Sequence, residues 1–304
     1  MEDTEKQPMK WKEPIWKISK GGGQVKRILR VSEINEIARH LKVDKQLLGK
    51  KFIDIRKKNM IRWLQFLTVS GMRFSEVYRF QQNKEWNGKP LFDPDRQTIF
   101  MPKPIFGDLG KGKVVNKERI VFLSDRGVFY TKIFLEEAYI PNFISTGMPA
   151  TIPYLAHAFD SILRETTKSI GMPTRPFAMT RKVYKMDYSN GVYIKKVDDK
   201  GKYVYTKQQI EMKEQTSGVL VRSFRSTWES YLVSQFMSDP LQLLNIVGSF
   251  GHNRETAEEY YIVANQFDSE DLKEIASLTK GWGIIHTKKP EVKDNTEVKG
   301  EVND

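Results

Sequence analysis

Residues Leu220–Leu232 read LVRSFRSTWESYL. The large apolar residues Phe224, Trp228 and Leu232 recur at every fourth position, which is the spacing of one face of a buried helix. Arg222 and Arg225 are three residues apart, so they share a different face of that helix. Two neighbouring guanidinium groups repel each other unless an anion lies beside them, and such a pair matches the shape of a phosphate. The stretch therefore predicts a core helix that carries a candidate phosphate-binding pair.

The composition favours a partner with many negative charges. The chain has 304 residues, and 50 Lys and Arg against 38 Asp and Glu give a formal net charge of +12. Such an excess favours nucleic acid, although a need for solubility alone also accounts for it. There is no cysteine, which excludes disulfides, thiolate metal sites and cysteine nucleophiles, and four His supply an all-nitrogen metal site poorly. No apolar run approaches the roughly 18 residues of a membrane span, so we expect a soluble intracellular protein.

Helical spacing continues on both sides of the opening stretch. Ser32 is a candidate N-cap for a first helix. A stronger helix is expected over Met60–Val69 and should end near Gly71, and another should begin at Arg73. Further helices are expected at about 128–138, 152–169, 220–237, 240–248, 253–263 and 269–280.

Two pairs of β-prone segments interrupt the helices. Thr98–Met101 and Arg119–Phe122 are expected to form a hairpin with a long, Lys-rich loop. Val192–Val197 and Lys202–Thr206 are expected to form a second hairpin around a tight turn that contains Gly201. The sum predicts an α+β fold that is mostly helical, with a small antiparallel sheet.

The ends of the chain are more polar than its middle. Residues 1–26 are rich in Lys and contain three consecutive glycines, so we expect a flexible basic arm there. Residues 27–286 are expected to form one folded domain, and residues 287–304 a disordered charged tail.

One motif comes close to a nucleotide-binding loop. Gly107–Val114 (GDLGKGKV) nearly matches GxxxxGK[ST], but Val114 stands where the motif needs a hydroxyl group to hold Mg²⁺. The motif also needs a helix to follow, and β-prone residues follow instead. We therefore reject a nucleotide site and keep these lysines as cations of the hairpin loop.

Three short stretches occur in an order that is characteristic of one family. They are Thr68–Glu76 (TVSGMRFSE), Arg222–Leu232 (RSFRSTWESYL) and Gly251–Tyr261 (GHNRETAEEYY), with the basic hairpin between the first and the second. Together they resemble the TGxRxSE, HxxRHTFxxxL and LGHxxxxxTxxxY boxes of the tyrosine recombinases, or integrases. The resemblance covers roughly residues 27–284, and the phrases FRSTWESYLV and Lys280–Trp282 (KGW) are most similar to archaeal virus and plasmid integrases.

The resemblance implies a reaction on DNA that uses no metal, no ATP and no other cofactor. Arg73 and Arg225 would grip the non-bridging oxygens of a phosphodiester, and His252 and Arg222 would donate further hydrogen bonds. Tyr261 would attack the phosphorus, leaving a 3′-phosphotyrosyl bond and a free 5′-hydroxyl. Without a metal, these fixed cations and donors would have to stabilise the negative charge of the transition state.

The choice of nucleophile depends on helical phase. Tyr260 and Tyr261 are neighbours on a helix expected to begin near Asn253, so their side chains point about 100° apart and only one can face the site. The resemblance selects Tyr261, nine residues after His252. The alternative is that Tyr261 belongs to the core and Tyr260 to the surface.

A lysine of the hairpin would protonate the leaving 5′-oxygen. Lys111 matches the family's turn best, Lys103 at the end of the first strand is nearly as good, and Lys113 is third. Lys113, Lys117 and Arg119 are expected to contact DNA. Non-specific phosphate contact is also the alternative role of the three candidate acids.

Two departures from the family pattern stand out. Arg222 occupies a position that is usually His, or Lys in some branches, and Arg is effectively always protonated, so a general-base role there is doubtful. The family's separate DNA-clamping domain would also precede Arg73 by far more residues than this chain has. Either this branch does without that domain, or the chain is the catalytic domain alone.

The resemblance further implies a specific double-stranded DNA site, a homotetramer that joins two duplexes, and a cytoplasmic, DNA-associated protein. The first alternative is a type IB topoisomerase-like strand swivel, which uses the same chemistry without exchanging partners. The second is a catalytically silent DNA-binding regulator on the same fold. The third is a basic nucleic-acid-binding protein outside the family, for which all three matches would be coincidence.

Overall fold

The computed structural model describes residues 10–18, 25–43, 46–48, 51–106, 118–251 and 261–283. Its helices are α1 (Val31–Arg39), α2 (Lys57–Ser70), α3 (Phe74–Gln82), α4 (Lys103–Phe106), α5 (Asp125–Glu137), α6 (Ile152–Ser169), α7 (Val221–Phe236), α8 (Pro240–Phe250), α10 (Tyr261–Ala264) and α11 (Ser269–Thr279). Its strands are β1 (Ile15–Ile18), β2 (Val25–Ile28), β3 (Gln46–Leu48), β4 (Lys51–Ile53), β5 (Glu85–Trp86), β6 (Lys89–Pro90), β7 (Phe92–Asp93), β8 (Thr98–Met101), β9 (Arg119–Phe122), β10 (Arg175–Tyr184), β11 (Met186–Ser189), β12 (Val192–Lys195) and β13 (Tyr205–Thr216).

Helix α7 is the centre of the body, as its apolar spacing predicts. Phe224, Trp228 and Leu232 are each fully buried. Phe224 belongs to a large core cluster together with side chains of α2, α3, α5 and α6, whereas Trp228 and Leu232 belong to a second cluster with α8, α10 and α11. Burial of each such side chain contributes about 1.5–3 kcal/mol. One helix thus joins both parts of the core.

A glycine corner joins α2 to α3. Gly71 ends α2 in the left-handed region, with φ at +61°, as its place after the apolar stripe predicts. A Cβ atom at Gly71 would lie 2.6 Å from Phe250 and 2.8 Å from Trp228, so no larger residue fits there. The close approach brings the start of α3, and with it Arg73, against α7 and the end of α8.

The first predicted hairpin is confirmed and belongs to a three-stranded antiparallel sheet of order β7-β8-β9. Strands β8 and β9 pair from Thr98↔Phe122 to Met101↔Arg119. The hydroxyl of Ser249, near the end of α8, accepts a hydrogen bond from the Phe122 N–H at 2.9 Å and lies 3.3 Å from the Ile120 carbonyl oxygen. The end of α8 is therefore fixed against β9.

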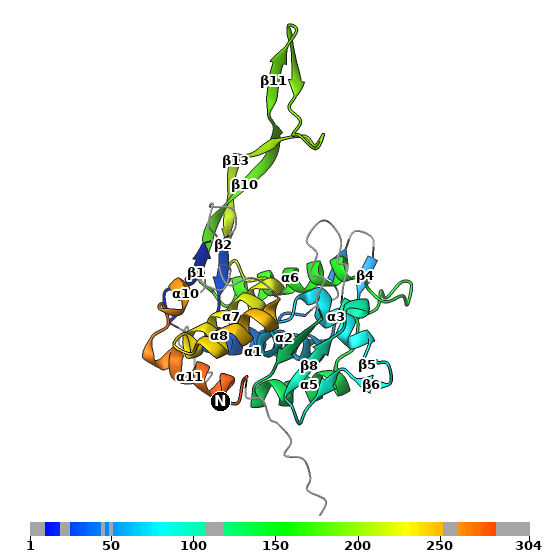
Figure 1. Cartoon of the computed structure of the whole chain (residues 1–304), viewed down its shortest axis with the longest axis vertical. Coiled ribbons are helices and arrows are strands. Elements are labelled where there is room, and N and C mark those ends of the chain that lie inside the picture. The colour runs from blue at the N-terminus through cyan, green and yellow to red at the C-terminus, as the bar shows by residue number, and fades with distance from the viewer. Residues whose placement is uncertain are drawn as a thin grey trace, which may run out of the picture.

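The second predicted hairpin is wrong in its pairing. Strand β12 pairs with β11 around Asn190-Gly191, and β13 pairs with β10, so that a long two-stranded arm projects from the body (Figure 1). Between the two segments expected to pair, the structure forms the single bridge Val197↔Tyr203. Asn190 and Gly191 have φ values of +51° and +79°, the signature of a two-residue hairpin turn that the sequence reasoning overlooked.

The start of the chain also differs from the prediction. Within the region expected to be a flexible arm, β1 pairs with β2, and Ile15 is buried in the second core cluster. The lysines in this region suggested an arm, but burial of apolar residues such as Ile15 holds the segment against the body. Helix α1 begins at Val31 rather than after Ser32, because the Glu33 carboxylate accepts the Arg30 N–H at 2.9 Å and supplies the cap.

The fold is α+β, mostly helical with small antiparallel sheets, as the sequence predicts. The bounds predicted for the catalytic domain, residues 27–286, stay a prediction. The disordered tail predicted over residues 287–304 lies outside the described residues.

Candidate active site

One buried carboxylate gathers three arginines from three elements. Glu76, in the first turn of α3, is 2% exposed. Its Oε1 accepts from Arg73 Nη1 at 2.8 Å and its Oε2 accepts from Arg119 Nη2 at 2.7 Å, while Arg225 Nη1 lies 3.9 Å from Oε2. Arg73 precedes α3, Arg119 begins β9 and Arg225 lies on α7. Residues far apart in the sequence thus form one cluster, which we call the Glu76 cluster (Arg73, Glu76, Arg119 and Arg225).

The Glu76 cluster keeps an excess of positive charge. Burial raises the pKa of the Glu76 carboxyl, but the charges of Arg119, Arg225 and Arg73 outweigh burial and lower that pKa to about 2. Burial lowers the pKa of Arg225 to about 10, which leaves its guanidinium protonated at neutral pH. The charge of Glu229 also acts on Arg225, so three cations against two anions leave about one uncompensated positive charge, a setting that favours a phosphate group.

Arg225 holds two chain corners in place. Its Nη1 donates to the Gly71 carbonyl oxygen at 2.5 Å and its Nη2 donates to the Phe250 carbonyl oxygen at 2.6 Å. Its guanidinium carbon lies 4.8 Å from the centre of the Phe250 ring. Arg225 therefore fixes the end of α2 and the end of α8 relative to α7, a role that the sequence did not suggest.

The other two predicted arginines of the site are more open. The Arg73 side chain is 36% exposed, so part of its guanidinium can meet a ligand. Arg222 is exposed on the first turn of α7, where its charge acts on Asp160 of α6. Burial raises the pKa of Asp160, whose carboxylate also accepts the Val221 N–H at 2.8 Å.

The residue that ends α8, Gly251, lies next to the Arg119 side chain. Gly251 caps α8 in the left-handed region, and a Cβ atom there would lie 3.0 Å from Arg119 Nη1. His252 is the next residue, but it lies outside the described residues. Tyr261 is the first residue of α10, which packs against α7 and β1. The Tyr261 side chain is also outside the described part, so the phase argument for Tyr261 over Tyr260 stays a prediction.

Of the lysines predicted to act as the general acid or to contact DNA, the structure describes only Lys103. Lys103 is exposed at the first residue of α4, and α4 is fixed to α3 because Arg79 Nη1 donates to the Ile105 carbonyl oxygen at 2.7 Å. Lys111, Lys113 and Lys117 lie outside the described residues.

Comparisons with known proteins give remote likenesses. No protein-family model and no curated protein sequence matches this chain. Among solved structures, a variant of the Tn1549 transposon integrase in complex with transposon right-end DNA aligns over 85% of this chain and 67% of its own, with 10% identity and a TM-score of 0.42. The Tn1549 integrase in complex with circular intermediate DNA aligns over 82% and 66%, with 11% identity and a TM-score of 0.41. The present chain spans about two thirds of the length of each.

The sequence reasoning missed the roles of Glu76 and Arg119. Glu76 closes the first of the three matched stretches, and in the structure it is the anion shared by three arginines. Arg119 was expected to contact DNA, and the structure places it 8% exposed against Glu76. No sequence signal links these two residues, which are 43 positions apart. The DNA contact of Arg119 stays a prediction.

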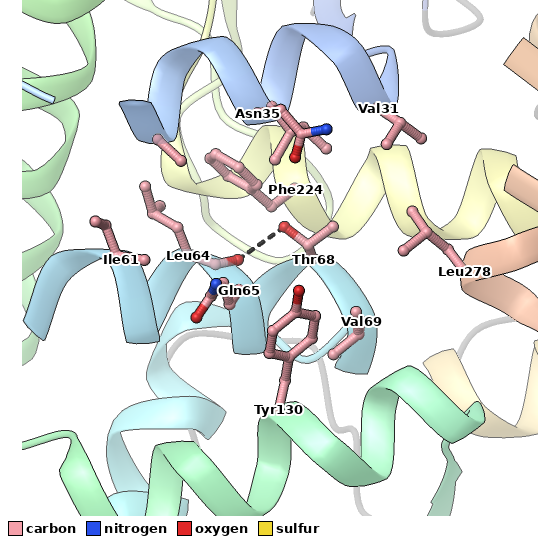
Figure 2. A pocket seen from close by; sticks show the side chains of 12 residues that line it. Val31, Asn35, Ile61, Leu64, Gln65, Thr68, Val69, Tyr130, Phe224 and Leu278 are labelled. Atoms are coloured by element: carbon pink, nitrogen blue, oxygen red, sulfur yellow. Dashed lines mark hydrogen bonds between the residues drawn. The ribbon is translucent and has the colours of Figure 1, made fainter. Parts of the chain in front are cut away.

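A separate pocket lacks the chemistry of such a site. Figure 2 shows it between α1, α2, α5 and α7, where Phe224 and Leu64 line it and the Thr68 hydroxyl donates to the Leu64 carbonyl oxygen. None of its lining side chains is charged. Among the described residues, no group of three His, Asp or Glu could hold a metal ion, and no helix is long and apolar enough to cross a membrane.

Proposed function

We propose that this protein is a site-specific DNA recombinase of the tyrosine recombinase type. The observation that carries the proposal is the Glu76 cluster, in which Arg73 and Arg225, the two arginines predicted to bind phosphate, meet although 152 positions of chain separate them. The similarity of FRSTWESYLV to archaeal virus and plasmid integrases is part of the same proposal and rests on sequence alone.

The proposed reaction begins with attack on a DNA phosphodiester. The hydroxyl oxygen of Tyr261 forms a bond to phosphorus, the bond from phosphorus to the 5′-oxygen breaks, and the 3′ end of the strand stays on the tyrosine. A tyrosine hydroxyl has a pKa of about 10, so it needs help to lose its proton at neutral pH. The excess positive charge of the cluster supplies that help, because it stabilises both the phenolate and the phosphorane while the phenol proton passes to solvent water.

The arginines would share the transition state unequally. Arg225 has five N–H donors and spends two on the Gly71 and Phe250 carbonyls, so the others stay available to a non-bridging oxygen. The open part of Arg73 would hold the second oxygen. His252 and Arg222 would donate further hydrogen bonds, and Arg119 would position Glu76 in addition to any contact with DNA.

The leaving 5′-oxygen must gain a proton, and Lys111 or Lys103 would supply it. A substrate with sulfur in place of that 5′-oxygen separates the two candidates, since a thiolate leaves without protonation. Alanine at the true acid should abolish cleavage of the oxygen substrate and leave cleavage of the sulfur substrate nearly normal. A lysine whose variant shows equal loss on both substrates is not the acid.

The protein–DNA bond conserves the energy of the phosphodiester, so a second 5′-hydroxyl can reverse the step without ATP. Exchange between two duplexes involves four strands, and we propose that four protomers assemble on two specific DNA sites. A topoisomerase-like swivel would instead relax supercoiled plasmid that lacks the specific site.

Trapping the covalent intermediate tests the proposal. A nicked substrate loses a short fragment after cleavage, so the adduct accumulates and its peptide can be mapped. We expect adduct from the unaltered chain and from the matched control Tyr260→Phe, and none from Tyr261→Phe. An adduct that persists in Tyr261→Phe would overturn the assignment of the nucleophile.

A further inference from the structure

The arm formed by β10–β13 has no role in the reaction just described. It projects well beyond the body (Figure 1), and its tip side chains stand in solvent: Tyr188 is 65% exposed and Tyr193 is 68% exposed. A two-stranded hairpin that stands alone is only marginally stable in water. Exposed aromatic side chains gathered on such an element indicate a binding surface.

All five tyrosines of the arm share one face. Residues that stand opposite each other in a ladder point to the same side, as do residues two apart on a strand. Tyr184 stands opposite Tyr205, and Tyr188 stands opposite Tyr193. Tyr203 is two residues from Tyr205, and its ring lies 5.7 Å from that of Tyr184.

Lys195 joins the two halves of this face. It stands opposite Met186, two residues from Tyr188, and its Nζ lies 4.5 Å from the Tyr184 ring and 5.5 Å from the Tyr203 ring. The surface is therefore a row of aromatic rings with a cation among them. We call it the tyrosine face (Tyr184, Tyr188, Tyr193, Lys195, Tyr203 and Tyr205).

The charge of the arm favours a polyanion. Residues 175–216 contain ten Lys and Arg against five Asp and Glu. Aromatic rings that stack on bases and sugars, together with cations that meet phosphates, are the recurring parts of DNA-binding surfaces. Interfaces between proteins are instead depleted in lysine.

The base of the arm is fixed to the body next to the start of α7. The Arg175 guanidinium lies 5.1 Å from the centre of the Trp16 ring, and a Cβ atom at Gly218 would lie 2.7 Å from the same ring. Strand β13 ends at Thr216, six residues before Arg222 on α7. Arg225 of the Glu76 cluster is only nine positions after the end of β13, so we expect DNA bound at that cluster to extend toward the arm.

We propose that the tyrosine face binds duplex DNA that flanks the cleaved phosphate. Arg175 and Ser189 span 15 positions, which at about 3.3 Å per residue gives the arm a reach of roughly 50 Å, or about 15 base pairs. A two-stranded ribbon fits the major groove. This inference takes its ligand from the proposed function but does not depend on the tyrosine chemistry.

The first test shortens the arm. Because Tyr184 and Tyr205 are paired, residues 185–204 can be replaced by an Asn-Gly turn that keeps the lower ladder. Binding is measured on a short core duplex and on the same core with about 20 flanking base pairs on each side. We expect the full chain to bind the longer duplex roughly tenfold more tightly, with a steeper salt dependence, and the shortened chain to lose that gain.

A second test changes side chains and leaves the arm in place. The variant Tyr188→Ser/Tyr193→Ser alters the tyrosine face, and Val192→Ser/Ile194→Ser is its matched control, because these neighbours point to the opposite face and are 61% and 51% exposed. We expect the tyrosine variant alone to lose flank-dependent affinity, and Tyr188→Phe/Tyr193→Phe to keep most of it.

Three results would overturn the inference. The first is equal affinity of the full chain for the two duplexes, and the second is an equal loss of flank-dependent affinity in the two serine variants. The third is that shortening the arm abolishes self-association and leaves binding to the flanks unchanged, which would assign the arm to a second copy of this chain. Adduct formation on a nicked core is measured in parallel. If the full chain forms no adduct but binds flanks through the arm, the proposed function fails and this inference stands.

Discussion

Glu76 is the residue on which the arrangement of the arginines depends. Its carboxylate forms an ion pair with Arg119 and lies 3.9 Å from Arg225, and both of these guanidinium groups are largely buried. Removing one partner of a buried charge cluster leaves the others unpaired, which costs far more than losing a surface pair. The electrostatic stability of the site therefore depends strongly on the Glu76 side chain.

We expect Glu76→Gln to lower the free energy of unfolding by about 3 kcal/mol at neutral pH. Urea unfolding measures the change. Glu137→Gln is the matched control, because Glu137 also meets two cations, Lys58 and Arg62, but at the surface, and its loss should be much smaller.

We expect the effect of Glu76→Gln on the free energy of unfolding to depend on pH. The folded-state pKa of Glu76 is about 2, below its ordinary value of 4.5, so its contribution is complete above the ordinary value and is lost as the pH falls toward the folded value. The difference in unfolding free energy between the unaltered chain and Glu76→Gln should be constant above about pH 5.5 and shrink toward pH 2. A difference that persists unchanged in acid would contradict this origin.

Arg222 and Arg225 share a helix turn but differ in burial, so their variants should separate stability from activity. Arg222→Ala should leave the unfolding free energy within about 0.5 kcal/mol and lower the rate of adduct formation about 100-fold. Arg225→Ala should lower both, since it also frees the Gly71 and Phe250 carbonyls. Thermal unfolding and single-turnover cleavage measure the two effects, and equal destabilisation by both variants would refute this division.

At the scale of elements, the corner between α2 and α3 decides where Arg73 lies. Gly71 needs its left-handed backbone and also its missing side chain, since both Phe250 and Trp228 press against it. Packing at this corner therefore fixes the stretch Thr68–Glu76, which carries Arg73, against α7 and α8.

We expect Gly71→Ala to destabilise the fold by about 3 kcal/mol, because it adds a steric overlap to the cost of the left-handed backbone. Gly88→Ala is the control, since its φ of +72° is similar but nothing lies within 4 Å of the added Cβ. It should cost only about 1 kcal/mol. Calorimetry compares them, and similar losses would mean that packing at the corner is looser than described.

At the scale of the whole molecule, the arm and the body are separate in their energetics. No residue of β11 or β12 is buried, and of the arm side chains that the structure describes, none belongs to either core cluster. Folding of the body therefore draws little on the arm.

The arm-shortened chain should accordingly unfold at nearly the temperature of the full chain when no DNA is present. Differential scanning calorimetry measures this directly. A drop of more than about 4 °C, corresponding to roughly 1 kcal/mol or more, would show that the arm stabilises the body.

Local pattern predicted much of the fold. The helix expected at 152–169 is α6, Ile152–Ser169, the helix around Arg225 is α7, and β8 and β9 have the predicted bounds. These elements follow from the spacing of apolar residues within one or two turns of chain, and the sequence contains that spacing in full.

Only the tertiary structure decided how those elements meet. The contact between Arg119 and Glu76, and the pairing of β10 with β13, join segments whose local patterns carry no information about each other. Both contacts follow from burial. The largely buried Arg119 needs an anion beside it, and the two strands at the base of the arm are held together where Trp16 packs against Arg175 and Gly218. The sequence by itself determined helices such as α2, α6 and α7, the first hairpin and the candidate arginines, whereas packing decided which charges share the site and which strands form the arm.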